Sequence, residues 1–208
     1  MDAWTFRDFA AGADALRRVA QLGTGPTVIR LSDEEETSVS LAQVGGRPAA
    51  GKLAESWDHG RFKAPYLRDA LLGAGVFCET LETATTWSNL AVLRAAVTAA
   101  LADGFDREHA RNRILCHISH VYPTGASLYF TVIAGLGPDP LEPWERVKSG
   151  VNDAIMATGG TISHHHGVGA DHAPWLEREV GATGLRMLRA VRAELDPAGI
   201  MNPGALLA

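Results

Sequence analysis

The sequence has 208 residues, of which 46% are hydrophobic and 21% charged, and its formal net charge is −5. This composition is ordinary for a globular protein with a buried core, and the length suffices for one large domain or two small ones. The lack of a basic excess argues against nucleic acid as a partner, because no surplus cations are present to neutralise phosphates. A local basic pocket for a small phosphorylated substrate stays compatible with this charge.

Two further features concern the cellular compartment. The N-terminal residues lack the basic and apolar regions of a signal peptide, and no apolar run is long enough to span a bilayer. Cys78 and Cys116 are far apart in the sequence, which predicts reduced and buried thiols instead of a disulfide framework. Together these features predict a cytoplasmic protein.

The N-terminal part of the chain predicts a helix, a short strand and a second helical segment. Apolar residues repeat with helical spacing over 9–22, and Gly23 stands at the stop position. Residues 27–31 predict a short strand, and the acidic residues 33–36 open a short helix or turn. The Gly-Gly-Arg-Pro cluster at 45–48 predicts a loop or junction.

The central part predicts helical turns, a strand and a longer helix. Residues 65–72 have the pattern of one or two helical turns, and residues 76–83 have that of a strand. Thr86 is a suitable N-cap for a helix over 87–102, which we expect to end at Asp103 and Gly104.

The C-terminal half predicts a hairpin followed by helices. Strands over 114–122 and 127–134 are joined by Pro-Thr-Gly-Ala, a turn of hairpin length. A helix over 141–158 follows, and two more cover 171–180 and 184–194. The order of elements predicts an α+β fold, in which helices cover one face of an antiparallel sheet and a helical segment ends the chain.

The hairpin sequence separates two kinds of side chain, because successive strand residues point to opposite faces. One face is apolar and must belong to the core: Leu128, Phe130 and Val132. The other face is polar without being charged: Ser127, Tyr129 and Thr131, with His117 and Ser119 on the partner strand. This polar face is either a solvated outer surface or the wall of a ligand cavity.

The strongest local signal is Gly-Gly-Thr-Ile-Ser-His-His-His-Gly-Val-Gly at 159–169, which we call the histidine loop. Flanking glycines allow sharp turns and close approach to a flat ligand, and histidine suits proton transfer near neutral pH. His164 and His166 could share a metal with His172, but no carboxylate or cysteine is suitably spaced. A structural surface loop is a second alternative. We favour a catalytic or cofactor-contacting loop, and predict no metal.

Several motifs carry a resemblance to a known family. They are the histidine loop, the segment 61–69, Trp87, the hairpin residues 116–120 and 127–130, and the tail 196–204. Together they resemble the C-terminal cap region of alkyldihydroxyacetonephosphate synthases, which belong to the FAD-linked oxidases of the vanillyl-alcohol-oxidase superfamily. Lactate and glycolate oxidoreductases of that superfamily are similar, but usually carry Gly-Glu-His-Gly where this chain has three histidines.

The resemblance implies a fold, a cofactor and a reaction. The fold is the ferredoxin-like cap domain of FAD-linked oxidases, with a cap domain over 1–158 and a segment over 159–208 that returns to an FAD-binding domain. The cofactor is FAD. The reaction exchanges the acyl group of acyl-dihydroxyacetonephosphate for a fatty alcohol in ether-lipid synthesis. A dehydrogenase of 2-hydroxy acids and a non-catalytic or metal-binding module are the alternatives.

The resemblance also assigns roles to individual residues. The catalytic set it implies is Tyr129, His165, His166 and Arg68. Substrate binding falls to Arg30 and His164, and cofactor binding to His164, His165, Arg68 and Asn202. Other interpretations stay open: Arg68 could pair with Asp69 or Glu79, Arg30 could lie on the surface, Tyr129 could be an ordinary strand residue, and His117 and His120 could be structural.

Two departures from the family pattern affect the expected partners. No Gly-rich pyrophosphate loop precedes Trp4, so an upstream FAD-binding domain is expected as a partner. The interval from Arg30 to Arg68 is several dozen residues shorter than in relatives. A lipid phosphate is the expected substrate, and peripheral membrane contact and a homodimer are further expectations.

Overall fold

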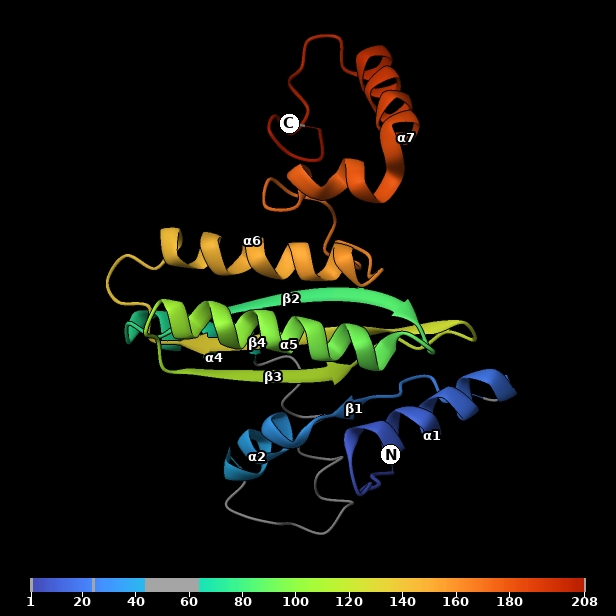
Figure 1. Cartoon of the computed structure of the whole chain (residues 1–208), viewed down its shortest axis with the longest axis vertical. Coiled ribbons are helices and arrows are strands. Elements are labelled where there is room, and N and C mark those ends of the chain that lie inside the picture. The colour runs from blue at the N-terminus through green and yellow to red at the C-terminus, as the bar shows by residue number, and fades with distance from the viewer. Residues whose placement is uncertain (1, 24, 44–63, 208) are drawn as a thin grey trace.

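The computed structural model describes residues 2–23, 25–43 and 64–207 (Figure 1). The N-terminal elements are α1 (Phe9–Leu22), β1 (Leu31–Ser32), α2 (Glu34–Gln43) and α4 (Ala64–Gly73). The central and C-terminal elements are β2 (Phe77–Thr86), α5 (Leu90–Arg107), β3 (Asn112–Ile118), β4 (Gly125–Ala134), α6 (Leu141–Ala157) and α7 (Ala173–Leu195). The predicted loop at 45–48 and the motif residues 61–63 lie outside the described residues.

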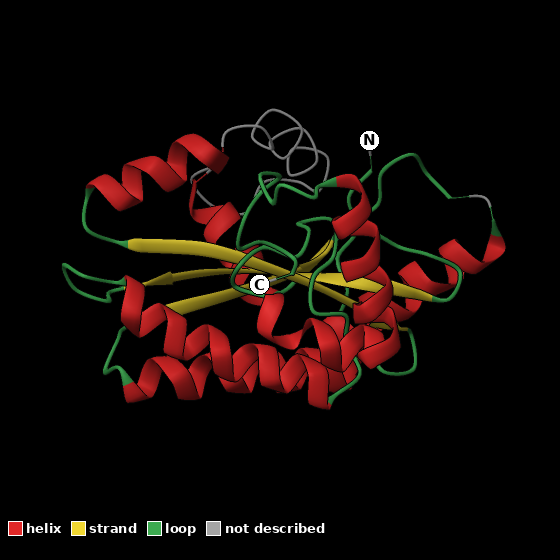
Figure 2. Cartoon of the chain, turned by 90° about the horizontal axis from the view of Figure 1, so that it is seen from above, coloured by secondary structure: helices red, strands yellow, loops and turns green. Residues whose placement is uncertain are grey.

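The four strands form one sheet in the order β1-β3-β4-β2, and each neighbouring pair is antiparallel. Figure 2 shows the two long helices α5 and α6 running along one side of this sheet. The predicted α+β class, with an antiparallel sheet covered by helices on one face, is therefore confirmed.

The core lies between the sheet and the two long helices. The apolar hairpin residues predicted to face it, Leu128, Phe130 and Val132, are fully buried. They pack in one cluster with the apolar side of α5 and with Trp144 on α6, whose ring lies 5.1 Å from that of Phe77. Both cysteines are buried and free, as predicted.

Several predicted boundaries were wrong because tertiary contacts override local signals, and the strand predicted over 114–122 ends at Ile118. Thr86 is not an N-cap: β2 continues to this residue, and α5 begins only after Asn89. The helix also does not end at Gly104 but reaches Arg107. A Cβ atom at Gly104 would lie 3.0 Å from Val147 Cγ1, so this glycine permits close packing of α6 instead of ending α5. The strand predicted over 27–31 is reduced to Leu31 and Ser32.

The C-terminal helices form a separate layer. Figure 1 places α7 on the side of α6 that faces away from the sheet. The backbone of α7 is non-helical at Gly181 (φ 72°, ψ 164°), so its two halves correspond to the two helices predicted there. Their small apolar cluster of Leu176, Leu185 and Leu207 is separate from the main core. None of the helices in the described ranges has the length and apolarity needed to cross a bilayer.

Candidate active site

Three polar side chains form a row across the face of the sheet opposite α5. Tyr129 on β4 is paired in register with His117 on β3 and with Glu82 on β2. Their neighbours along each strand, such as Phe130, point into the core, so alternation places all three on the other face. The His117 and Tyr129 rings are stacked, with centroids 4.7 Å apart. The predicted polar face therefore exists and centres on Tyr129.

The histidine loop is held against the free edge of β2. Thr161 N donates to Ala84 O (3.0 Å) and His164 N donates to Glu82 O (3.2 Å), so the loop continues the ladder beyond the last strand. Gly160 is required for this approach, because a Cβ atom there would lie 2.8 Å from both Leu93 Cδ1 and Thr83 Oγ1. These contacts with β2 bring the histidine loop beside Tyr129.

The loop places its three imidazoles in different environments. His164 and His165 are stacked with centroids 3.9 Å apart, and the edge of His165 meets His120 at 4.4 Å. The ring of His166 stands nearly perpendicular to that of Tyr129, at 5.5 Å. His165 and His166 are exposed, and His165 has the left-handed backbone conformation (φ 59°) that turns the loop. The structure thus brings four predicted site residues together: Tyr129, His164, His165 and His166.

Glu82 lies at the centre of this cluster, although sequence reasoning did not single it out. Its side chain is 1% exposed. Its Oε1 atom lies 3.1 Å from Ser119 Oγ, 3.3 Å from His120 Nδ1 and 3.2 Å from His164 Nδ1. Its Oε2 atom lies 3.5 Å from His166 Nε2. The contact with His164 is within reach but too bent for a regular hydrogen bond. Alternation within β2 could have placed Glu82 on the polar face, but the sequence does not give its register with Tyr129.

Burial and hydrogen bonds set the charge state of this cluster. Burial alone would raise the pKa of Glu82, but the hydroxyl donors Ser127 and Ser119 and the nearby His164 imidazole hold that pKa below its usual range. Burial lowers the pKa of His164, and the nearby Glu82 carboxylate only partly opposes this. At neutral pH Glu82 is therefore an anion, and the adjacent His164 is a neutral imidazole.

A second network supports the other side of Tyr129. Arg30 Nη2 lies 2.5 Å from Glu36 Oε1 and 2.8 Å from His117 Nδ1, which is itself 3.0 Å from the same Glu36 oxygen. His117 Nδ1 can donate to Glu36 or accept from Arg30, but not both at once. Burial lowers the pKa of His117, despite the Glu36 carboxylate. Arg30 therefore contacts the His117 ring, which in turn stacks on Tyr129.

Two predicted site residues lie outside the cluster. Arg68 on α4 pairs with Glu79 at 3.0 Å, which is one of the alternatives left open from the sequence. No hydrogen bond or ion pair joins Arg68 to the histidine loop within the part of the chain that the structure describes. Asn202 is exposed in the C-terminal tail, which reaches the histidine loop through a bond from Leu206 N to Val168 O (3.1 Å). Their proposed contacts with a cofactor stay predictions.

One group of imidazoles could hold a metal ion. Among the described residues, His120, His164 and His165 have ligand nitrogens within 4.8 Å of one another. This group differs from the pair His164 and His166 considered from the sequence. The absence of a metal stays a prediction.

Comparison with known families places this site in context. The sequence pattern described as FAD linked oxidases, C-terminal domain, matches residues 2–55 and 47–206. The chain belongs to this family. The two matched pieces meet at residues 47–55, inside the interval between Arg30 and Arg68 where the sequence predicts a shortening.

The most similar relatives include three proteins named alkyldihydroxyacetonephosphate synthase. The chain is 32% identical to that of Trypanosoma brucei brucei over 81% of its length, and 31% identical to that of Dictyostelium discoideum over 97%. It is 34% identical to that of Caenorhabditis elegans over 70% of its length. The chain spans only 28%, 43% and 25% of these relatives, respectively.

Solved structures confirm the fold. A crystal structure of an alkyldihydroxyacetonephosphate synthase superposes with a TM-score of 0.68 over 95% of this chain and 43% of the other, at 21% identity. A second crystal form gives a TM-score of 0.61. FAD is the cofactor of the family to which the chain belongs. The exposed His166 ring beside the half-buried Tyr129, with the exposed His165 next to it in the loop, fits a flat, hydrogen-bonding ring system supplied from outside the sheet.

Proposed function

We propose that this chain is the substrate-binding cap of an FAD-dependent enzyme of the alkyldihydroxyacetonephosphate synthase type. Such an enzyme exchanges the acyl group of acyl-dihydroxyacetonephosphate for a fatty alcohol and releases a fatty acid. The observation that carries the proposal is the contact of the Tyr129 ring with the rings of His117 and His166, of which His166 is exposed. The named relatives support the same reaction.

Each part of the cluster has a chemical task in this reaction. Tyr129 is the group that moves a proton at the substrate carbon. A phenol is a poor base because its ordinary pKa is about 10, so it needs neighbouring hydrogen-bond donors. His165 and His166 stabilise negative charge that develops on the substrate, and Arg30, whose Nη2 lies 2.8 Å from His117 Nδ1, is the cation for a phosphate group.

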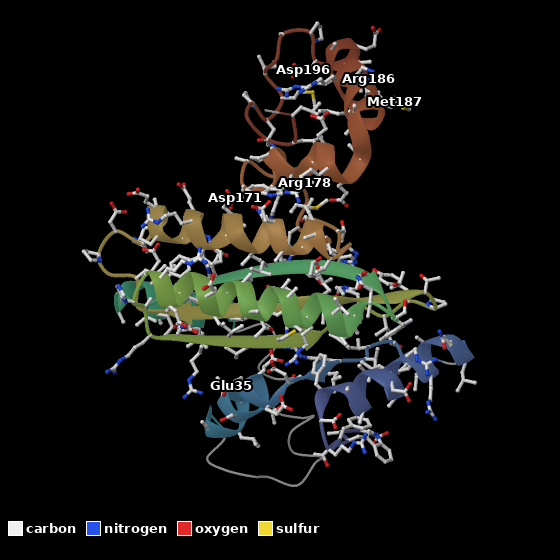
Figure 3. The ribbon with its side chains drawn as sticks, viewed as in Figure 1. Glu35, Asp171, Arg178, Arg186, Met187 and Asp196 are labelled. Carbon is white, nitrogen blue, oxygen red and sulfur yellow. The ribbon has the colours of Figure 1, made fainter. Side chains whose placement is uncertain are left out.

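The FAD contacts belong to the exposed part of the site. When bound, FAD supplies the electron-accepting ring of the reaction. In our proposal His164, His165 and Asn202 contact this cofactor, while Arg68 would have to leave its pair with Glu79 to reach it. The upstream FAD-binding domain is the proposed partner. Exposed apolar side chains on the second half of α7, among them Met187 (Figure 3), support a docking surface there, and Val191 on the same half is also exposed.

The test uses the full-length protein loaded with FAD. It receives acyl-dihydroxyacetonephosphate and an isotope-labelled fatty alcohol, and product is separated by chromatography. We expect one labelled ether lipid and one fatty acid per turnover. Absence of label in the product while FAD stays bound would contradict the proposal.

A second candidate is a dehydrogenase of 2-hydroxy acids. The glycolate oxidase subunit GlcD of Bacillus subtilis is 36% identical to this chain, but over only 70 residues. This candidate predicts that glycolate or lactate, added without an acyl substrate, reduces the bound flavin and bleaches its visible absorbance. Bleaching without label exchange would favour it over the synthase.

Membrane contact, a homodimer and a cytoplasmic location are further proposals. The exposed aromatic side chains of Trp4 and Tyr66 support contact with a lipid surface. Co-sedimentation with vesicles, sedimentation velocity and cell fractionation test the three proposals in turn.

A further inference from the structure

The Glu82 carboxylate is a buried charge whose histidine partners come from two separate segments of the chain. His120 and Ser119 belong to the connection between β3 and β4, whereas His164 and His166 belong to the histidine loop. An ionised carboxylate only accepts hydrogen bonds, and leaving it buried without donors is costly. Every nitrogen that faces Glu82 must therefore carry its hydrogen on that side.

His164 has contacts on both of its ring nitrogens. Nδ1 lies 3.2 Å from Glu82 Oε1, and Nε2 lies 3.0 Å from the hydroxyl of Tyr122. With the hydrogen on Nδ1, the lone pair of Nε2 accepts the hydrogen bond from Tyr122. The opposite tautomer would place the Nδ1 lone pair against the carboxylate, which is repulsive. The Nδ1–H form keeps the Nδ1 lone pair away from the carboxylate and lets Nε2 accept from Tyr122, although its angle to Glu82 is too bent for a regular hydrogen bond.

The same reasoning assigns the other two rings. Ser119 Oγ donates to Glu82 Oε1 (3.1 Å) and so accepts from His120 Nδ1 (3.0 Å), which therefore carries a hydrogen. His166 faces the other carboxylate oxygen with Nε2, at 3.5 Å. In the neutral form of this ring the hydrogen is then on Nε2, which leaves the Nδ1 lone pair on a ring that stands against Tyr129.

We infer that Glu82 is a positioning residue, which fixes the tautomer and orientation of His120, His164 and His166 around Tyr129. Its importance for turnover rests on the proposed function. A histidine that assists proton transfer must present the correct nitrogen to its partner, and a second residue that accepts from the opposite nitrogen enforces this. In serine proteases, replacing such a carboxylate by an amide lowers kcat about 10⁴-fold through the wrong tautomer.

The first experiment measures the tautomers directly in the 208-residue chain. Ring nitrogens are labelled with ¹⁵N, because their chemical shifts distinguish Nδ1–H from Nε2–H, and single His→Ala variants assign the signals. We expect Nδ1–H for His120 and His164, and Nε2–H for His166. Any other assignment in the wild-type chain overturns the inference, even if no Glu82 variant folds.

The second experiment replaces the carboxylate by an amide in Glu82→Gln. The amide nitrogen is a donor, so at least one ring must reverse its tautomer. The matched control is Glu35→Gln, which makes the same change on α2 (Figure 3), where Glu35 pairs with Arg113 at 2.7 Å. We expect altered ¹⁵N shifts in Glu82→Gln alone. Unchanged tautomers in that variant overturn the inference.

Turnover provides the third measurement, in the FAD-loaded full-length enzyme. In Glu82→Gln we expect kcat to fall by about 10²-fold to 10⁴-fold while KM and the flavin absorbance change little. A rise in KM with unchanged kcat would instead indicate a merely structural role. If the wild-type enzyme exchanges no acyl group, the proposed function fails, while the tautomer measurements still decide the role of Glu82.

Discussion

The ion pair of Glu36 with Arg30 and His117 gives a stability prediction whose size follows from the structure. Burial would raise the Glu36 pKa, but the hydrogen bond and charge of His117 and the charge of Arg30 lower this pKa from 4.5 to about 2. The Glu36 side chain is only 12% exposed, so solvent screens these interactions little. A depressed pKa of this size corresponds to up to about 3 kcal/mol of folding free energy at neutral pH.

The perturbation is Glu36→Gln, and the sign of its pH dependence is fixed. The folded pKa of Glu36 lies below its unfolded value, so its stabilisation is complete above about pH 4.5 and is lost as the pH falls towards about 2. The wild-type chain should therefore exceed the variant by up to about 3 kcal/mol at pH 7. This difference should shrink steadily below pH 4.5 and approach its minimum near pH 2.

The assay is urea unfolding of both chains at a series of pH values, followed by circular dichroism. Glu35→Gln is the control, because its surface pair with Arg113 should contribute less than about 1 kcal/mol at any pH. A difference between wild type and Glu36→Gln that does not vary with pH would refute the reasoning. So would a difference at pH 7 no larger than that of the control.

Three further predictions concern the site and the core. Tyr129→Phe should lower acyl exchange by about 10²-fold to 10⁴-fold with unchanged flavin absorbance and urea midpoint, and a fully active variant would remove Tyr129 from the mechanism. Gly160→Ala should cost about 1–3 kcal/mol in urea unfolding, because its methyl group would meet Leu93 at 2.8 Å; equal stability would show that the loop can shift freely. Phe130→Ala should cost about 3–5 kcal/mol in the same assay, and a loss below about 1 kcal/mol would contradict its place in the core.

Local patterns in the sequence were sufficient for most elements of the fold. The helical spacing before Gly23 gave α1 with its correct bounds, and Gly23 ends it in the left-handed conformation. Alternation in the hairpin separated the buried Phe130 from the half-buried Tyr129. These features depend on neighbours within a few residues, so the sequence alone reveals them.

Most residues of the site could also be predicted from the sequence, because three adjacent histidines between glycines are rare and resemble a known family motif. The sequence did not show which residue organises them. Glu82 lies on a strand that pairs with β4 from far along the chain, and its register opposite Tyr129 is set by the assembled sheet. The pairing of Arg68 with Glu79 likewise depends on where α4 packs, which local sequence does not encode.

The sequence by itself determined the kinds of chemistry available: a phenol on the polar face of a sheet and a loop of imidazoles. Only the tertiary structure decided that Gly160 lets this loop reach the edge of β2, and that a buried carboxylate meets three of the rings there. The physical reason is that periodicity and capping act over a few residues. Burial of charge and hydrogen-bond satisfaction depend instead on segments that only folding brings together.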